Sequence, residues 1–96
     1  MFAFVACFDI SDDRLRRKVG QRLGHFGIRV QRSVFEIAVN THEELAALKL
    51  EIEAWIDDDD NDDNNLRFYP LCKTCRKKAC DHHGERVAAF PAAVVV

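Results

Sequence analysis

A carboxylate ends the first apolar run of the chain. Residues 2–8 are all apolar, and Asp9 follows them directly. A carboxylate at the end of a buried strand can hold a divalent metal ion or act as an acid or a base. It can instead begin a turn and accept hydrogen bonds from neighbouring backbone amides. The residue types alone leave both roles open for Asp9.

Basic side chains are concentrated in the segment that follows. Residues 12–32 contain seven basic and two acidic residues, which gives a net charge of +5. Clustered arginine suits bidentate recognition of phosphate groups. The alternative is an ordinary solvated helix face, whose long side chains keep their charges in water. The candidate nucleic-acid-binding residues are Arg14, Arg16, Arg17, Lys18, Arg29 and Arg32.

Cysteine and histidine gather near the C-terminus. Three thiols and one imidazole can form a Cys3His zinc site. A single Cys-x-x-Cys with an irregular third ligand has limited specificity, and the same cysteines can be small buried residues or a disulfide pair. Zinc is therefore not the cofactor we expect. The candidate zinc ligands are Cys72, Cys75, Cys80 and His82.

The formal net charge of −2 conceals a strong segregation of charge. Residues 33–66 sum to −10, whereas residues 67–86 sum to +4. A basic face can bind phosphates whatever the total charge of the protein is. The total therefore does not exclude a nucleic-acid partner.

Length and composition restrict the class of protein. A chain of 96 residues with 48% hydrophobic and 31% charged residues is expected to form one small globular domain with a marginal core, so an oligomer is a reasonable default. No apolar run approaches the roughly 18–20 residues of a transmembrane helix, so we expect no membrane partner. The N-terminus lacks a basic leader, and four cysteines without a secretory signal indicate a cytoplasmic location.

The hydrophobic pattern predicts alternating strands and helices that would position these residues. Ser11 is the expected N-cap of the first helix, Gly27 its expected C′ residue, and Thr41 opens a capping box for the second helix. Residues 57–65 should form a solvated acidic loop, and residues 72–91 an irregular basic segment. The predicted elements are a strand over 2–8, a helix over 12–26, two strands within 28–40 that break near Ser33, a helix from 41 to 56, a strand over 66–71 and a strand over 92–96.

This order predicts an α+β fold, a ferredoxin-like βαββαβ sandwich with an extra C-terminal strand. We expect a single domain over residues 1–96, with a core of about 1–71 and a basic, dimer-pairing tail over 72–96. The last strand has no place in that core, and an apolar terminal strand needs an edge to pair with. Pairing with a second subunit would make the protein a homodimer.

Three segments together resemble one family. They are VACFDISDDRLRRKV at 5–19, GIRVQRSVFE at 27–36 and LRFYPLC at 66–72. At this spacing they are similar to the small CRISPR-associated protein of the spacer-acquisition (adaptation) complex, its non-integrase subunit. One departure is visible, because the family usually has tyrosine before the acid and this chain has Phe8.

The resemblance implies a dimer with a ferredoxin-like fold whose C-terminal strand packs on the partner subunit. It implies that Asp9 is the catalytic, metal-binding acid of a Mg²⁺- or Mn²⁺-dependent endonuclease acting on RNA or DNA in antiviral defence. The implied partners are the CRISPR integrase, double-stranded DNA and single-stranded RNA. The alternative is a non-catalytic DNA-binding scaffold of the integration complex. Residues implied at the groove are Phe8, Arg16, Arg29, Ser33 and Phe35.

Overall fold

A computed structural model describes residues 1–88, and the strand expected over 92–96 lies outside the described residues. The elements in chain order are β1 (Phe2–Asp9), α1 (Asp13–Gly24), β2 (Gly27–Gln31), β3 (Val34–Val39), α2 (His42–Asp57), β4 (Asn65–Leu71) and α3 (Lys73–Lys78). The four strands form one antiparallel sheet in the order β2-β3-β1-β4. The α+β class and the ferredoxin-like strand order predicted from the hydrophobic pattern are confirmed.

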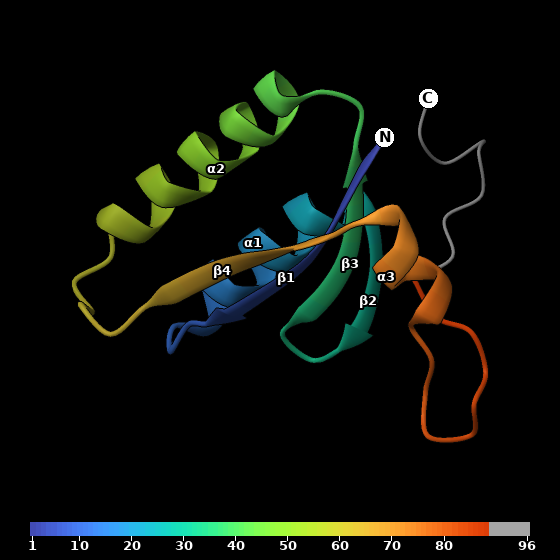
Figure 1. The fold of residues 1–96 in the computed structure, drawn as a ribbon. Helices are drawn as coiled ribbons and strands as arrows, with labels where there is room; N and C mark the ends of the chain where they lie inside the picture. Colours follow the sequence, from blue (N-terminus) through green and yellow to red (C-terminus); the bar gives the residue numbers. More distant parts are fainter. Residues whose placement is uncertain (89–96) are drawn as a thin grey trace.

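The main core lies between the sheet and the pair α1 and α2, which pack on one of its faces (Figure 1). Side chains alternate along β1, so Phe4, Ala6 and Phe8 face the helices. Directly opposite on β3, Ile37 and Phe35 pair with the first two of these and point the same way. The largest fully buried side chains of the helices are Val19, Leu23, Leu48 and Ile52. The other face of the sheet carries Asp9.

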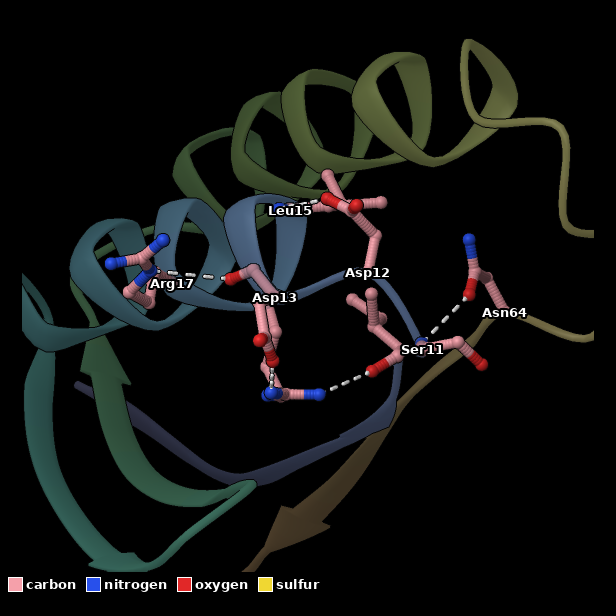
Figure 2. Close-up of polar contacts among 8 residues, drawn as sticks. Ser11, Asp12, Asp13, Leu15, Arg17 and Asn64 are labelled. Carbon is pink, nitrogen blue, oxygen red and sulfur yellow. Dashed lines mark hydrogen bonds and ion pairs between the residues drawn. The ribbon is translucent and has the colours of Figure 1, made fainter.

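The first helix is capped by Asp12, not by Ser11 as predicted. The Asp12 carboxylate accepts a hydrogen bond from the Leu15 amide at 2.8 Å (Figure 2). The Ser11 amide instead donates to the side-chain oxygen of Asn64 at 3.4 Å, which ties the start of α1 to the start of β4. Thr41 caps α2 as predicted, because its hydroxyl accepts from the Glu44 amide at 3.1 Å.

Gly27 opens β2 and is not the residue that ends α1. The helix ends at Gly24 and is capped by His25, whose backbone is right-handed. A Cβ at position 27 would collide with the carbonyl oxygen of Glu36 and would lie 2.7 Å from the Cα of Ile37. Glycine is therefore required here because β2 approaches β3 closely, not because a helix terminates.

This close approach predicts opposite effects for two glycine-to-alanine variants. Gly27→Ala should lower the free energy of unfolding by about 3 kcal/mol, because backbone atoms must move to admit the methyl group. Gly24→Ala should raise it by up to about 1 kcal/mol, because alanine favours the helix and its Cβ would meet only the Phe35 ring at 4.0 Å. Urea unfolding followed by circular dichroism measures both. Equal effects of the two substitutions would contradict this packing.

The basic segment after β4 is not irregular throughout, because residues 73–78 form α3. The Cys72 sulfur accepts the Cys75 amide at 3.3 Å, and the Arg76 amide donates to the Cys72 carbonyl at 2.9 Å. The chain then turns around Asp81 and reaches the sheet at Ala88, whose amide donates to the Glu36 carboxylate at 3.1 Å. None of the helices in residues 1–88 has the length and apolar character to cross a membrane.

Candidate metal site and nucleic-acid interface

Asp9 lies on the rim of a hollow of about 380 Å³ at one end of the sheet. It is the last residue of β1, it is exposed, and it pairs in register with Asn65 of β4. Among residues 1–88 its carboxylate accepts no hydrogen bond and forms no ion pair. The carboxylate is therefore available to a ligand. The hollow is lined by Cys7, Phe8, Asp9, Asp63, Asn65, Arg67 and Tyr69.

Sequence reasoning missed the contribution of β4 to this hollow. Asn65, Arg67 and Tyr69 alternate along the strand and share the face that carries Asp9. The Arg67 guanidinium donates to the Asn65 side-chain oxygen at 3.3 Å and to the Tyr69 hydroxyl at 3.2 Å. The hydrogen bond to Tyr69 raises the pKa of Arg67. The positive charge of Arg67 therefore lies on β4, the strand that pairs with β1, and lines the same hollow as Asp9.

The donor atoms of the hollow suit a hard cation. Asp9, Asp63 and Asn65 offer carboxylate and amide oxygens, which are the ligands that magnesium and manganese prefer. Magnesium commonly uses one or two carboxylates and keeps several waters. Within residues 1–88 no three His, Cys, Asp or Glu side chains are placed to hold one ion together. A single copy of the chain therefore supplies a partial site.

A second hollow, of about 360 Å³, is lined by four arginines and one acid. Arg16 and Arg17 come from α1, whereas Arg29 and Arg32 come from β2 and the turn after it. The acid, Asp13, forms an ion pair with Arg16. We call this hollow, lined by Asp13, Arg16, Arg17, Arg29 and Arg32, the arginine cleft. Its excess of guanidinium groups suits phosphate recognition.

Two of the six predicted basic residues do not line this cleft. Lys18 lies over the Trp55 ring of α2, with its Nζ 4.2 Å from the ring centre. Arg22, one helical turn further on, bonds Glu51 of α2 at 3.0 Å, so this flank of α1 faces α2. Arg14 precedes Lys18 by four residues and shares that flank. The rotation of α1 about its axis thus separates Arg14 and Lys18 from the cleft residues.

Arg16 also has a structural role. Its guanidinium donates to the Ile10 carbonyl at 3.1 Å in addition to its ion pair with Asp13, so it holds the connection between β1 and α1. Arg17 is less restricted, because its Nε makes one long hydrogen bond of 3.4 Å to the Asp13 carbonyl (Figure 2). Substitution of Arg16 would therefore disturb folding and binding together, whereas Arg17 tests binding more cleanly.

Of the predicted groove residues Phe8, Ser33 and Phe35, Phe8 lines the Asp9 hollow, and the other two contact residues that line a hollow. Phe8 and Phe35 are buried, and their rings stack with centres 6.2 Å apart. The Arg29 guanidinium lies over the Phe35 ring, 5.6 Å from its centre, so one of the cleft arginines packs on this ring. The Ser33 carbonyl accepts the Phe8 amide at 3.1 Å. Together with the hydrogen bond from Arg16 to the Ile10 carbonyl, these contacts fix residues 8–10, of which Phe8 and Asp9 line the Asp9 hollow.

The four candidate zinc ligands are not assembled into a site. Cys72, Cys75, Cys80 and His82 are exposed, and among residues 1–88 no set of three metal-ligating side chains comes together. Cys72 caps α3 and Cys75 lies inside this helix, whereas Cys80 and His82 belong to the segment that follows it. Residues 1–88 therefore contain no preformed site made of these four residues.

Comparison with known proteins identifies the family. The sequence profile described as "CRISPR associated protein Cas2" matches residues 1–79. The chain belongs to the Cas2 family. Curated Cas2 relatives include "CRISPR-associated endoribonuclease Cas2 4" of Rhodospirillum rubrum, which is 38% identical over 84% of this chain. "CRISPR-associated endoribonuclease Cas2 3" of a Synechocystis species is 38% identical over 74% of this chain and 73% of its own length. This chain spans only 62% of the length of the Rhodospirillum relative.

Solved structures agree with this assignment to the Cas2 family. A chain of a "Partial Cas6-RT-Cas1--Cas2 complex" superposes with a TM-score of 0.84 at 34% identity, covering 94% of this chain and all of the other. Streptococcus pyogenes Cas2 superposes with a TM-score of 0.69 over 82% of this chain and 96% of the other, at 24% identity, and supports the fold alone. The expected family and its ferredoxin-like fold are confirmed.

Proposed function

We propose that this Cas2 protein is a homodimeric, divalent-metal-dependent endonuclease that binds nucleic acid in its arginine cleft and works with the CRISPR integrase in spacer acquisition. The observation that carries the proposal is the short link between the two hollows: Phe8 and Asp9 line one of them, and the carbonyl of the next residue, Ile10, accepts a hydrogen bond from Arg16 of the arginine cleft. The endoribonuclease names of the curated relatives support the activity. The Cas1–Cas2 assembly named for the superposed structure supports the partner.

The roles of the residues follow from their chemistry. Asp9, with the oxygens of Asp63 and Asn65 nearby, would hold Mg²⁺ or Mn²⁺. When bound, such an ion supplies a more acidic water and offsets negative charge on phosphoryl oxygens. Arg67 would contact the phosphate beside Asp9, and the Tyr69 hydroxyl would supply a polar group that Phe8 lacks. The cleft arginines would hold the nucleic-acid backbone.

The homodimer is proposed to form through the sheet face that α1 and α2 leave uncovered. A row of paired residues crosses this face from Ile28 through Glu36 and Val5 to Tyr69. Ile28 is 60% exposed and Tyr69 is 48% exposed, and Val30 on the same strand as Ile28 is 42% exposed. A second copy would bury these side chains. A two-fold axis near Asp9 would add a second carboxylate to the partial metal site.

Ile28→Asp should convert the dimer to a monomer, because it would bury a charge without a partner at the interface. Leu50→Asp is the matched control, since Leu50 is 68% exposed on α2, away from this face. Sedimentation velocity at several protein concentrations measures the outcome. If Ile28→Asp remains as dimeric as Leu50→Asp, the sheet face opposite α1 and α2 is not the interface.

The non-catalytic scaffold is the alternative function, and one observation favours it. The arginine cleft is built without Asp9, so it can bind duplex DNA whether or not the metal site is active.

Purified protein with Mg²⁺ or Mn²⁺, compared with the same protein in a chelator, should cleave single-stranded RNA or double-stranded DNA. If it binds DNA but cleaves neither substrate with either metal at any pH, the scaffold is the function.

A further inference from the structure

Two thiols lie side by side at the end of the sheet remote from Asp9. Cys72 directly follows β4, and Cys75 lies in α3, three residues later. Figure 1 shows α3 at the opposite end of β4 from the acidic loop that joins α2 to β4. Both cysteines are exposed and free. Small thiol reagents can therefore reach both of them.

The contact between the two cysteines is asymmetric. The Cys72 sulfur accepts the backbone amide of Cys75 at 3.3 Å, and it also accepts a hydrogen bond from the Cys75 thiol. These two bonds favour the thiolate form and lower the pKa of Cys72. The bond that Cys75 donates raises the pKa of Cys75, and Lys78 partly offsets this rise. One thiol is thus suited to attack, and its neighbour is suited to follow.

The segment that carries the pair is anchored to the fold. The Arg76 amide donates to the Cys72 carbonyl at 2.9 Å, and the Arg76 guanidinium donates to the Ala88 carbonyl at 3.4 Å. Ala88 in turn donates its amide to Glu36 of β3. The two thiols are therefore held together by a helix that is tied to the sheet. In a disordered tail, by contrast, the distance between the two thiols would vary and they would be close only part of the time.

We propose that Cys72 and Cys75 form a reversible dithiol–disulfide pair that exchanges with small-molecule disulfides. The proposal is independent of the nuclease function, since Cys72 follows the last residue of β4 whereas Asp9 of β1 pairs with its first residue, Asn65. Cysteines separated by two residues at the start of a helix are neighbours on one face, and side-chain rotation brings their sulfurs to bonding distance. Cys80 is exposed and free but has no such contact with either member of the pair.

The exchange takes place in two balanced steps. The Cys72 thiolate attacks one sulfur of the small disulfide, whose S–S bond breaks and whose other half leaves as a thiolate that takes a proton from solvent. Cys75 then loses its proton to solvent and attacks the Cys72 sulfur of the mixed disulfide, which releases the second small thiolate. The protein loses two electrons, and the small disulfide is reduced to two thiols.

Incubation of the full chain with oxidised and reduced glutathione in the presence of a chelator tests the proposal. After quenching, alkylation and digestion, mass spectrometry should find a Cys72–Cys75 disulfide in the wild type and in the control Cys80→Ser. Cys75→Ser should stop at glutathione bound to Cys72. In Cys72→Ser, Cys75 should react about tenfold or more slowly than Cys72 does in Cys75→Ser, because only Cys72 accepts the backbone amide of residue 75, which favours its thiolate.

Competitive alkylation of the reduced wild type with iodoacetamide at neutral pH gives a second test. Cys72 should be modified faster than Cys80, which is also exposed but accepts no such hydrogen bond from residues 1–88. Two results would overturn the proposal. One is equal rates for Cys72 and Cys80, and the other is glutathione on all three exposed cysteines with no bond between Cys72 and Cys75.

Discussion

Asp9→Asn is expected to reduce metal-dependent cleavage by about 100-fold or more while nucleic-acid affinity stays within about threefold of the wild type. Asparagine keeps the size of the side chain but removes the charge that attracts the cation. Asp9 makes no hydrogen bond or ion pair through its carboxylate among residues 1–88, so the fold loses nothing by this change. Cleavage rates and fluorescence anisotropy on the same labelled substrate measure the two quantities.

Asp60→Asn is the matched control for this substitution. Asp60 is an exposed carboxylate of the loop between α2 and β4, and it does not line the Asp9 hollow. The control should cleave like the wild type. An equal loss of cleavage in Asp60→Asn and Asp9→Asn would show that cleavage depends on the total negative charge of the protein. That result would contradict a specific role for Asp9.

The second large effect is expected at the arginine cleft. The double variant Arg17→Ala with Arg32→Ala should weaken DNA binding by about 10- to 100-fold and reduce the slope of log affinity against log salt by about two. The reason is that both guanidinium groups line the cleft, and within residues 1–88 Arg17 makes one long hydrogen bond whereas Arg32 makes no hydrogen bond or ion pair. Arg16 is a poorer test residue because its guanidinium also donates a hydrogen bond to the Ile10 carbonyl, so its substitution would disturb the fold as well.

Arg14→Ala with Lys18→Ala removes the same charge from the other flank of α1. Lys18 covers Trp55, so this double variant should bind DNA within about threefold of the wild type. Anisotropy titrations over a range of salt concentrations compare the two double variants directly. Equal losses of affinity would mean that α1 binds DNA through its whole basic surface and that the cleft has no special role.

The fold could be predicted because its signals are local. The all-apolar run of β1 and the spacing of Leu15, Val19 and Leu23 reveal a buried strand and an amphipathic helix without knowledge of the neighbours. Predictions failed where a tertiary contact or a cap decided the outcome. Glycine is required at position 27 because the backbone of Glu36 leaves no room for a Cβ. The helix α3 has no apolar stripe to predict it and begins after its N-cap, Cys72.

The candidate site was predicted only in part, again for physical reasons. The strand pattern made Asp9 a candidate but left its role open, and only the family resemblance implied that it binds metal. Whether a basic residue of α1 lines the arginine cleft depends on which flank of this helix packs against α2. The sequence alone does not determine that flank. Arg67 was missed although Asn65, Arg67 and Tyr69 recur at the strand period of two, because only the register of β4 with β1 places them beside Asp9.

Manganese binding, followed by the loss of the free-ion signal in electron paramagnetic resonance, tests the proposed metal site most directly. Mn²⁺ is a spectroscopic substitute for Mg²⁺ with the same preference for oxygen ligands. The wild type and Asp60→Asn should bind the ion saturably, and Asp9→Asn should weaken that binding by at least about tenfold. Unchanged manganese binding in Asp9→Asn would contradict the assignment of Asp9 as the metal ligand of this Cas2 protein.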